Sequence, residues 1–324
     1  MMATLSPTNA ARKKSSFADR CKDSILDGHH KVEQLSSILN AGLVKNTPQG
    51  LRDCTMAALS HYGLLRGEDA RGIQLPDVQH LPMDHREIPT ALDIMVILLL
   101  DGKSNQKGDT QYIGAMRNKA WDVCPIGAMT MWLFYRFKLS GETFGPHMDS
   151  FARMDDPEQW YPLWLFPGKG KDGKSPLSSD AHAKATKSLL EDAGVRQHSK
   201  KVTHIFRGSG ARMADLGGAS ETNIRRGGRW DMSSMGKHYL TTLPRETMLV
   251  RAGFPASAGQ FWLARDLDPP EALENSIFPQ AQLWMKRMQD LPDSKRTIVA
   301  HGYLSLICHR RVLDGTRTSK TGQD

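Results

Sequence analysis

Residues 202–229 constrain the fold of this chain more than any other stretch. Their pattern predicts one helix, a tight turn at Gly217-Gly218 and a second helix that begins at Ser220, because glycine ends helices and serine caps their first turn. Three arginines follow on the second helix: Arg225, Arg226 and Arg229. Two helices joined in this way, with basic residues on the second, are typical of a helix-turn-helix that faces DNA.

Positive charge is concentrated around the same stretch. The 324 residues include 43 Lys and Arg against 35 Asp and Glu, which gives a formal net charge of +8. Residues 196–251 hold eleven basic and four acidic side chains, so they contribute +7 of that charge. This imbalance favours an anionic partner.

Several classes of protein and site are excluded by the sequence. The longest apolar run, residues 94–100, is far shorter than the roughly 20 residues of a membrane-spanning helix. The first 25 residues contain no apolar core of a secretory signal, so we expect the chain to stay inside the cell. The cysteines, at 21, 54, 124 and 308, lack the spacing of a zinc site or a disulfide framework. We therefore predict no metal and no cofactor.

The pattern of apolar residues divides the chain into three predicted parts. Residues 1–45 form a polar N-terminal segment with one short helix over 32–43. Residues 46–253 form a compact domain. Residues 254–324 form a C-terminal helical extension with a basic tail, in which 277–288 predict a helix.

Within the domain, residues 91–100 predict an apolar strand that enters a turn at Asp101-Gly102, which places Lys103 at the tip of a hairpin. Residues 141–162, rich in Pro, Gly and Asp, predict an inserted loop. Further predicted elements are helices over 120–139, with Trp121 in the core, and over 181–193, and a short strand over 163–166.

Residues 168–175 match the phosphate-loop pattern G-x-x-x-x-G-K-[ST]. A working loop of this kind runs directly into a helix, but Pro176 follows at once and disfavours helical geometry for Ser175. We interpret the segment as a solvated Gly/Lys loop whose Lys169 and Lys171 contact a DNA backbone. Nucleotide hydrolysis is the least favoured hypothesis.

His204 and Arg207 are three residues apart, so they share one face of a helix. An imidazole and a guanidinium that converge there can hold a phosphate, because Arg offers a bidentate fork and His a switchable donor. The same pair also fits a purely structural role through ordinary hydrogen bonds. The spacing alone leaves both alternatives open.

Several groups of residues together give the chain a resemblance to tyrosine recombinases. Three of these groups resemble the second signature box of that family: His204-Ile-Phe-Arg207, Gly228-Arg229-Trp230 and Tyr239-Leu240. The first box resembles residues 63–69, with Arg66 as its arginine, and the lysine hairpin resembles residues 102–105. The match covers residues 50–250. It is most similar to fungal Crypton recombinases and to the DNA-binding domain in the large subunit of the fungal centromere-binding complex.

This resemblance implies a mostly helical α+β fold of the tyrosine-recombinase catalytic type with a small antiparallel hairpin or sheet. In an active member, the residue at Tyr239 attacks a DNA phosphodiester and holds one strand as a 3′-phosphotyrosine, without metal or nucleotide. Arg66 and Arg207 would clamp the non-bridging oxygens as negative charge builds up.

The resemblance also implies three supporting roles. Lys103 would protonate the leaving oxygen and His204 would assist proton transfer or phosphate binding. Arg229 or Trp230 would stand where the family usually has a second His or Trp donor. Each residue also has an ordinary alternative: Lys103 as a charged hairpin tip, Trp230 as a core anchor, and Tyr239 as a buried ring.

The chain departs from the family pattern in three ways. Arg66 and Glu68 are two residues apart where many members have three, and their pairing as a surface ion pair is an alternative. Arg229 stands where a His is common. The roughly 45 residues before the first box are too few for the N-terminal helical domain that closes over the duplex in recombinases.

The sequence therefore predicts a nuclear protein whose function is to bind double-stranded DNA through phosphate contacts, with affinity that falls steeply with salt. The predicted DNA contacts are Arg212, Arg225, Arg226, Lys237, Lys169 and Lys171. Two alternatives remain: an active recombinase that cleaves through Tyr239, and a scaffold that forms homo-oligomers or binds a protein through its C-terminal extension.

Overall fold

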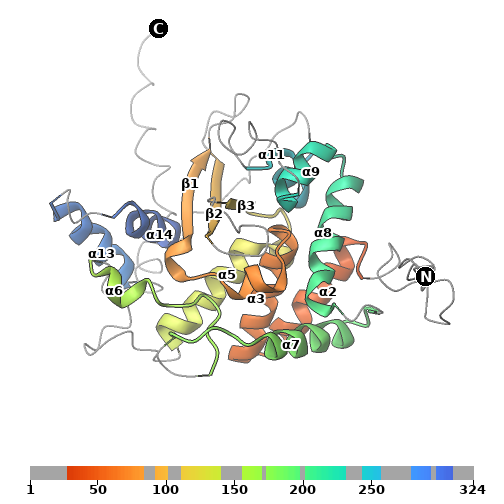
Figure 1. The fold of residues 1–324 in the computed structure, drawn as a ribbon, viewed down its shortest axis with the longest axis horizontal. Coiled ribbons are helices and arrows are strands. Elements are labelled where there is room, and N and C mark those ends of the chain that lie inside the picture. The colour runs from red at the N-terminus through yellow and green to blue at the C-terminus, as the bar shows by residue number, and fades with distance from the viewer. Residues whose placement is uncertain are drawn as a thin grey trace, which may run out of the picture.

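The computed structural model describes residues 28–83, 92–100, 111–139, 155–169, 173–197, 201–230, 243–256, 279–292 and 297–308. These residues form a mostly helical α+β fold with one three-stranded antiparallel sheet, so the predicted fold class is confirmed. Figure 1 shows α13 and α14 on one side of the sheet, and α8, α9 and α11 on the other.

The N-terminal helices form where the sequence predicts them. Helix α2, Val32–Leu43, buries Leu35, Ile38 and Leu39, whose spacing places them on one face. Helix α3, Pro48–Tyr62, packs beside it; its Thr47 cap accepts a hydrogen bond from the Gly50 amide, and proline occupies its first turn. This pair supports the rest of the core.

The sheet has the order β1-β2-β3, with β1 at Val78–Met83, β2 at Leu92–Leu99 and β3 at Gln111–Met116. The predicted apolar strand is confirmed as the central strand β2. Its side chains alternate between two clusters: Met95 and Ile97 enter the main core, whereas Ile94 and Val96 pack with Leu243 and neighbouring residues beneath α11. Both faces are covered, which explains why the run is continuously apolar.

The predicted helix over 120–139 is interrupted. A 3-10 turn, η2 at Trp121–Val123, precedes α5 at Pro125–Phe134, and the π-helical η3 at Tyr135–Leu139 follows. Pro125 causes the first interruption, because its ring is tolerated only at the start of a helix. The assignment of Trp121 to the core is wrong: the side chain is 75% exposed.

The other helices complete the described fold. They are α4 at Gly67–Arg71, α6 at Pro157–Trp160, α7 at Ser179–Asp192, α8 at Ile205–Leu216, α9 at Glu221–Gly228, α11 at Arg245–Arg251, α13 at Pro279–Asp290 and α14 at Ile298–Cys308, with 3-10 turns η1 at Leu75–Asp77 and η4 at Val202–His204. The strand predicted over 163–166 is reduced to an isolated bridge between Gln74 and Trp164. None of the described helices is both long and apolar enough to span a bilayer.

The described residues of the loop over 168–175 do not lead directly into a helix, as a phosphate-binding loop would. The Gly168 amide donates to the Ser175 carbonyl over 2.7 Å, and Pro167 bridges to Pro176, so the two ends of the loop lie side by side. Helix α7 begins only after Ser178, which caps it. A phosphate-loop geometry is therefore absent from these described residues.

Helix α14 packs on the sheet through β1, and α13 packs on α14. The Gln79 amide donates to the Val299 carbonyl over 3.2 Å, and the rings of Trp160 and Tyr303 lie 5.7 Å apart. Tyr303 and Trp284 belong to the same buried cluster as the core of α3. The helix expected near 277–288 is confirmed as α13, while the division of the chain into three parts stays a prediction.

Candidate functional site

The helix-turn-helix predicted from the sequence is formed by α8 and α9. The chain turns at Gly217-Gly218, where Gly218 has a φ of +86° that favours glycine. Ser220 caps α9: its hydroxyl oxygen accepts from the Asn223 amide. Arg207 lies in the first turn of α8 and Arg229 directly follows α9, so this motif brings the two arginines together.

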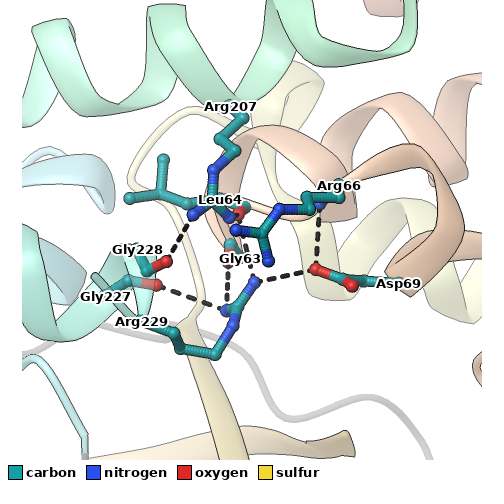
Figure 2. Close-up of polar contacts among 8 residues, drawn as sticks. All are labelled: Gly63, Leu64, Arg66, Asp69, Arg207, Gly227, Gly228 and Arg229. Carbon is teal, nitrogen blue, oxygen red and sulfur yellow. Dashed lines mark hydrogen bonds and ion pairs between the residues drawn. The ribbon is translucent and has the colours of Figure 1, made fainter. Parts of the chain in front are cut away.

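Both arginines point to the C-terminal end of α3. Helix ends leave carbonyl groups without intrahelical partners. Here the Leu64 carbonyl accepts from Nη1 of Arg207 and, over 3.2 Å, from Nη2 of Arg229, while the Gly63 carbonyl accepts from Nη1 of Arg229 over 3.1 Å (Figure 2). The guanidinium of Arg251, from α11, donates to the two preceding carbonyls, those of His61 and Tyr62.

Arg207 is buried, and its surroundings lower its pKa. Its Nη2 donates to the Gly228 carbonyl over 2.5 Å, and its guanidinium lies 4.6 Å from the centre of the Trp230 ring. Burial, followed by the positive charges of Arg229 and Arg66, lowers the pKa of Arg207 to about 9. Its positive charge is therefore held at an energetic cost, which a bound anion would reduce.

Arg66 lies directly after the same turn, as the residue that precedes α4. Its backbone amide donates to Oδ2 of Asp69 over 3.0 Å, and the same oxygen pairs with Nη2 of Arg229 at 3.1 Å. Figure 2 shows the guanidinium of Arg66 between those of Arg207 and Arg229. Asp69, three residues beyond Arg66, thus contacts Arg66 through its backbone amide and Arg229 through its guanidinium.

His204 lies at the edge of this cluster. It is the last residue of η4, immediately before α8, and it is exposed. Partial burial, followed by the charges of Lys201, Arg207 and Arg66, lowers the pKa of His204. This shift favours the neutral imidazole, which can accept as well as donate a hydrogen bond.

Comparison with known families identifies the chain. Residues 25–312 match the family of the centromere DNA-binding protein complex CBF3 subunit, domain 2. The chain belongs to this family. This match confirms the resemblance to the centromere-binding subunit domain that the sequence indicated.

Solved structures and curated sequences complete the comparison. The chain is similar to XerH site-specific recombinase bound to palindromic difH substrate in a post-cleavage complex, with 13% identity and a TM-score of 0.42 over 70% of this chain and 50% of that one. It is also similar to a Flpe-Holliday junction complex, with 13% identity and a TM-score of 0.48 over 88% of this chain and 65% of that one. It spans about half of the XerH chain. No curated sequence matches it significantly.

The described part of the chain includes only some of the predicted site residues. Arg66, His204, Arg207, Arg229 and Trp230 come together around the end of α3. Four other predicted residues lie outside the described residues: Lys103, Lys171, Lys237 and Tyr239. Their roles stay predictions.

The remaining predicted DNA contacts lie on described elements away from the cluster. Arg225 is exposed on α9 and pairs with Glu221 at 3.7 Å, while Arg226 beside it is half-buried. Arg212, on α8, donates to the Ser209 hydroxyl over 3.1 Å, and Lys169 is exposed on its loop. Their contacts with DNA stay predictions.

Sequence reasoning missed two residues of the cluster. Asp69 is part of the first-box segment, but Glu68 was the acidic residue paired with Arg66 in that interpretation. Arg251 was counted only as one charge of the basic stretch. The signal for Asp69 was its spacing: a carboxylate three residues after the residue that precedes a helix commonly accepts from that residue's amide. No local pattern marks Arg251.

Proposed function

We propose that this chain binds duplex DNA through its phosphates, and that Arg66 and Arg207 hold one phosphate at the end of α3. The observation that carries the proposal is the charge balance of the cluster. Three guanidinium groups, from Arg66, Arg207 and Arg229, lie together in Figure 2, and the carboxylate of Asp69 stands at one side of them and pairs with Arg229. A phosphodiester would supply the negative charge and the oxygen acceptors that suit guanidinium groups.

Membership in the CBF3 family supports duplex DNA as the partner, because the family description names a centromere DNA-binding complex. It also supports a nuclear location. Arg225 and Arg226 of α9, together with Lys169, would add contacts to neighbouring phosphates, and such contacts position a protein on DNA without reading its sequence.

Strand cleavage, self-association and a protein partner for the C-terminal extension remain hypotheses. Lys103 and Tyr239, which cleavage requires, lie outside the described residues. Incubation with a nicked suicide duplex tests cleavage: a covalent adduct that disappears in Tyr239→Phe would establish it.

The DNA-binding proposal is tested by titrating a fluorescein-labelled, mixed-sequence DNA duplex with the full chain at several salt concentrations. We expect affinity to fall linearly on a log–log plot, and Arg66→Gln to reduce the slope by about 0.9, the loss of one phosphate contact. The matched control is Lys286→Gln, which removes one exposed charge on α13, across the sheet from α8 (Figure 1).

Two outcomes would refute this proposal. One is binding that does not depend on salt, because phosphate contacts release counterions. The other is an Arg66→Gln protein whose affinity and salt slope equal those of the Lys286→Gln control. Arg66 suits this test better than Arg207, because Arg207 also supports the fold through its bonds to two backbone carbonyls.

A further inference from the structure

The terminal N–H groups of Arg229 already have hydrogen-bond acceptors inside the protein. Its Nη1 donates to the carbonyls of Gly63 and Gly227 at 3.1 and 3.3 Å. Its Nη2 donates to the Leu64 carbonyl at 3.2 Å and to Asp69 at 3.1 Å. A guanidinium has four N–H bonds on its two terminal nitrogens, so these contacts use all four. The fifth, on Nε, is buried and has no hydrogen-bond partner among the described residues.

We propose that Arg229 is a positioning residue that holds the turn of residues 63–66 and does not itself contact the phosphate. This inference rests on the proposed function. The sequence resemblance implied instead that Arg229 or Trp230 supplies a hydrogen bond to the phosphate. The geometry leaves that contact to Arg66 and Arg207, because each terminal nitrogen of Arg229 donates to two internal acceptors, whereas each terminal nitrogen of Arg207 donates to one among the described residues.

The turn requires such support. Leu64 has a φ of +48°, in the left-handed region that side chains other than glycine rarely adopt. Its carbonyl is fixed by Arg207 and Arg229, and its side chain is fully buried. Two residues later the chain reaches Arg66, so the direction of the Arg66 side chain depends on how the turn is held.

Asp69 completes the support. Its Oδ2 accepts from the Arg66 amide on one side and from the Arg229 guanidinium on the other. A single carboxylate oxygen therefore links the positioning arginine to the backbone of the residue that it positions. If Arg229 only anchors the turn, Asp69 assists DNA binding although it carries the same charge as DNA.

The substitution Asp69→Asn separates the two interpretations by the sign of its effect. The asparagine keeps an oxygen that can accept from the Arg66 amide but loses the ion pair with Arg229. We expect affinity for the labelled duplex to fall about tenfold, because Arg66 is less well placed. A rise in affinity would overturn the inference. It would mean that the loss of a negative charge, or the release of Arg229 toward the phosphate, affects binding more than the placement of Arg66 does.

A double-substitution cycle provides a second test with the same duplex. If Arg229 acts through Arg66, then Arg66→Gln, Arg229→Gln and the double variant each lose about 0.9 of the salt slope. If Arg229 binds a phosphate independently, the double variant loses about 1.8. Arg229→Lys is expected to behave like Arg229→Gln, because an ammonium cannot span the four acceptors; rescue by lysine would contradict positioning.

Thermal melting of each variant controls for loss of the fold. An Arg229→Gln protein that melts early but keeps the wild-type salt slope would show a purely structural role and overturn the inference. If Arg66→Gln matches the Lys286→Gln control, the proposed function fails, and the role of Arg229 fails with it. If Arg66→Gln lowers the slope and Arg229→Gln adds a separate loss, only the inference on Arg229 fails.

Discussion

Two buried histidines, His29 and His61, contact each other. Nε2 of His29 lies 3.1 Å from Nδ1 of His61, and neither side chain is accessible to solvent. Burial, followed by the charges of Arg212 and His30, lowers the pKa of His29 to about 3. Burial, then His29 and Arg251, holds the pKa of His61 well below its ordinary value. Both rings are therefore neutral in the folded protein.

The pair predicts a stability that declines in acid. In the unfolded chain both histidines take up a proton near pH 6.5, whereas in the folded chain they do not. The unfolded state thus binds more protons below that pH, and unfolding becomes easier by about 1.4 kcal/mol per pH unit for each histidine. Urea midpoints measured from about pH 7 to about pH 5 test this.

The control for this experiment is His29→Gln, which cannot titrate. It should be less stable at neutral pH, because it loses ring contacts with His61 and Phe206, but its stability should vary less with pH. A His29→Gln protein with the same pH dependence as the wild type would contradict this, because it would show that His29 takes up its proton at the same pH in the folded and unfolded states.

At the level of single residues, the sequence indicated which arginines meet but not what each one does. Arg66 and Arg207 were predictable because each stands in a recognisable motif. The role of Arg229 was not, because its acceptors are the carbonyls of Gly63 and Leu64, which lie far away in the chain. A backbone carbonyl has no sequence signature, so only the folded chain shows that these donors are occupied.

Among the elements, α8 and α3 are joined by a close contact at Gly210. A Cβ placed there would lie 2.5 Å from the His61 carbonyl oxygen, which belongs to backbone and cannot move aside cheaply. We therefore expect Gly210→Ala to destabilise the fold by about 1–3 kcal/mol, measured by urea unfolding. It should also weaken DNA binding, because α8 carries Arg207.

The same helix offers a matched control. Gly208 is exposed, and a Cβ placed there would meet only the end of the Arg212 side chain, at 3.9 Å. Gly208→Ala should therefore be neutral or stabilise the protein by up to about 1 kcal/mol, because alanine favours a helix over glycine. Equal effects of the two substitutions would mean that α8 does not pack on α3 as described.

Elements were predictable from sequence where local signals agree. Capping and glycine signals located the α8–α9 turn, and the apolar run located β2. The break of the expected 120–139 helix is local as well, since Pro125 starts α5, yet apolar spacing alone concealed it. The contact between Gly210 and His61 has no local signal, because glycine in a helix also occurs without a close neighbour, as at Gly208.

Across the whole molecule, the C-terminal helices share the core of the rest of the chain. Ala300, Tyr303 and Leu304 of α14 are fully buried, and Tyr303 packs on Trp160. The sequence interpretation treated residues 254–324 as an extension, because the composition shifts after Gly253-Phe254-Pro255. A shift in composition does not show where the helices that follow it pack.

Removal of residues 257–324 therefore tests whether this part is a separate unit. We expect the shortened chain to lose stability and to aggregate, because β1 and Trp160 would lose the apolar surface that covers them. Tyr303→Ala in the full chain probes the same contact and should cost about 3–5 kcal/mol in urea unfolding. A shortened chain that unfolds at the wild-type urea midpoint and keeps the wild-type salt slope on DNA would instead establish the C-terminal part as independent. The proposed phosphate site lies on the other side of the sheet, so loss of binding in the shortened chain should accompany unfolding rather than precede it (Figure 1).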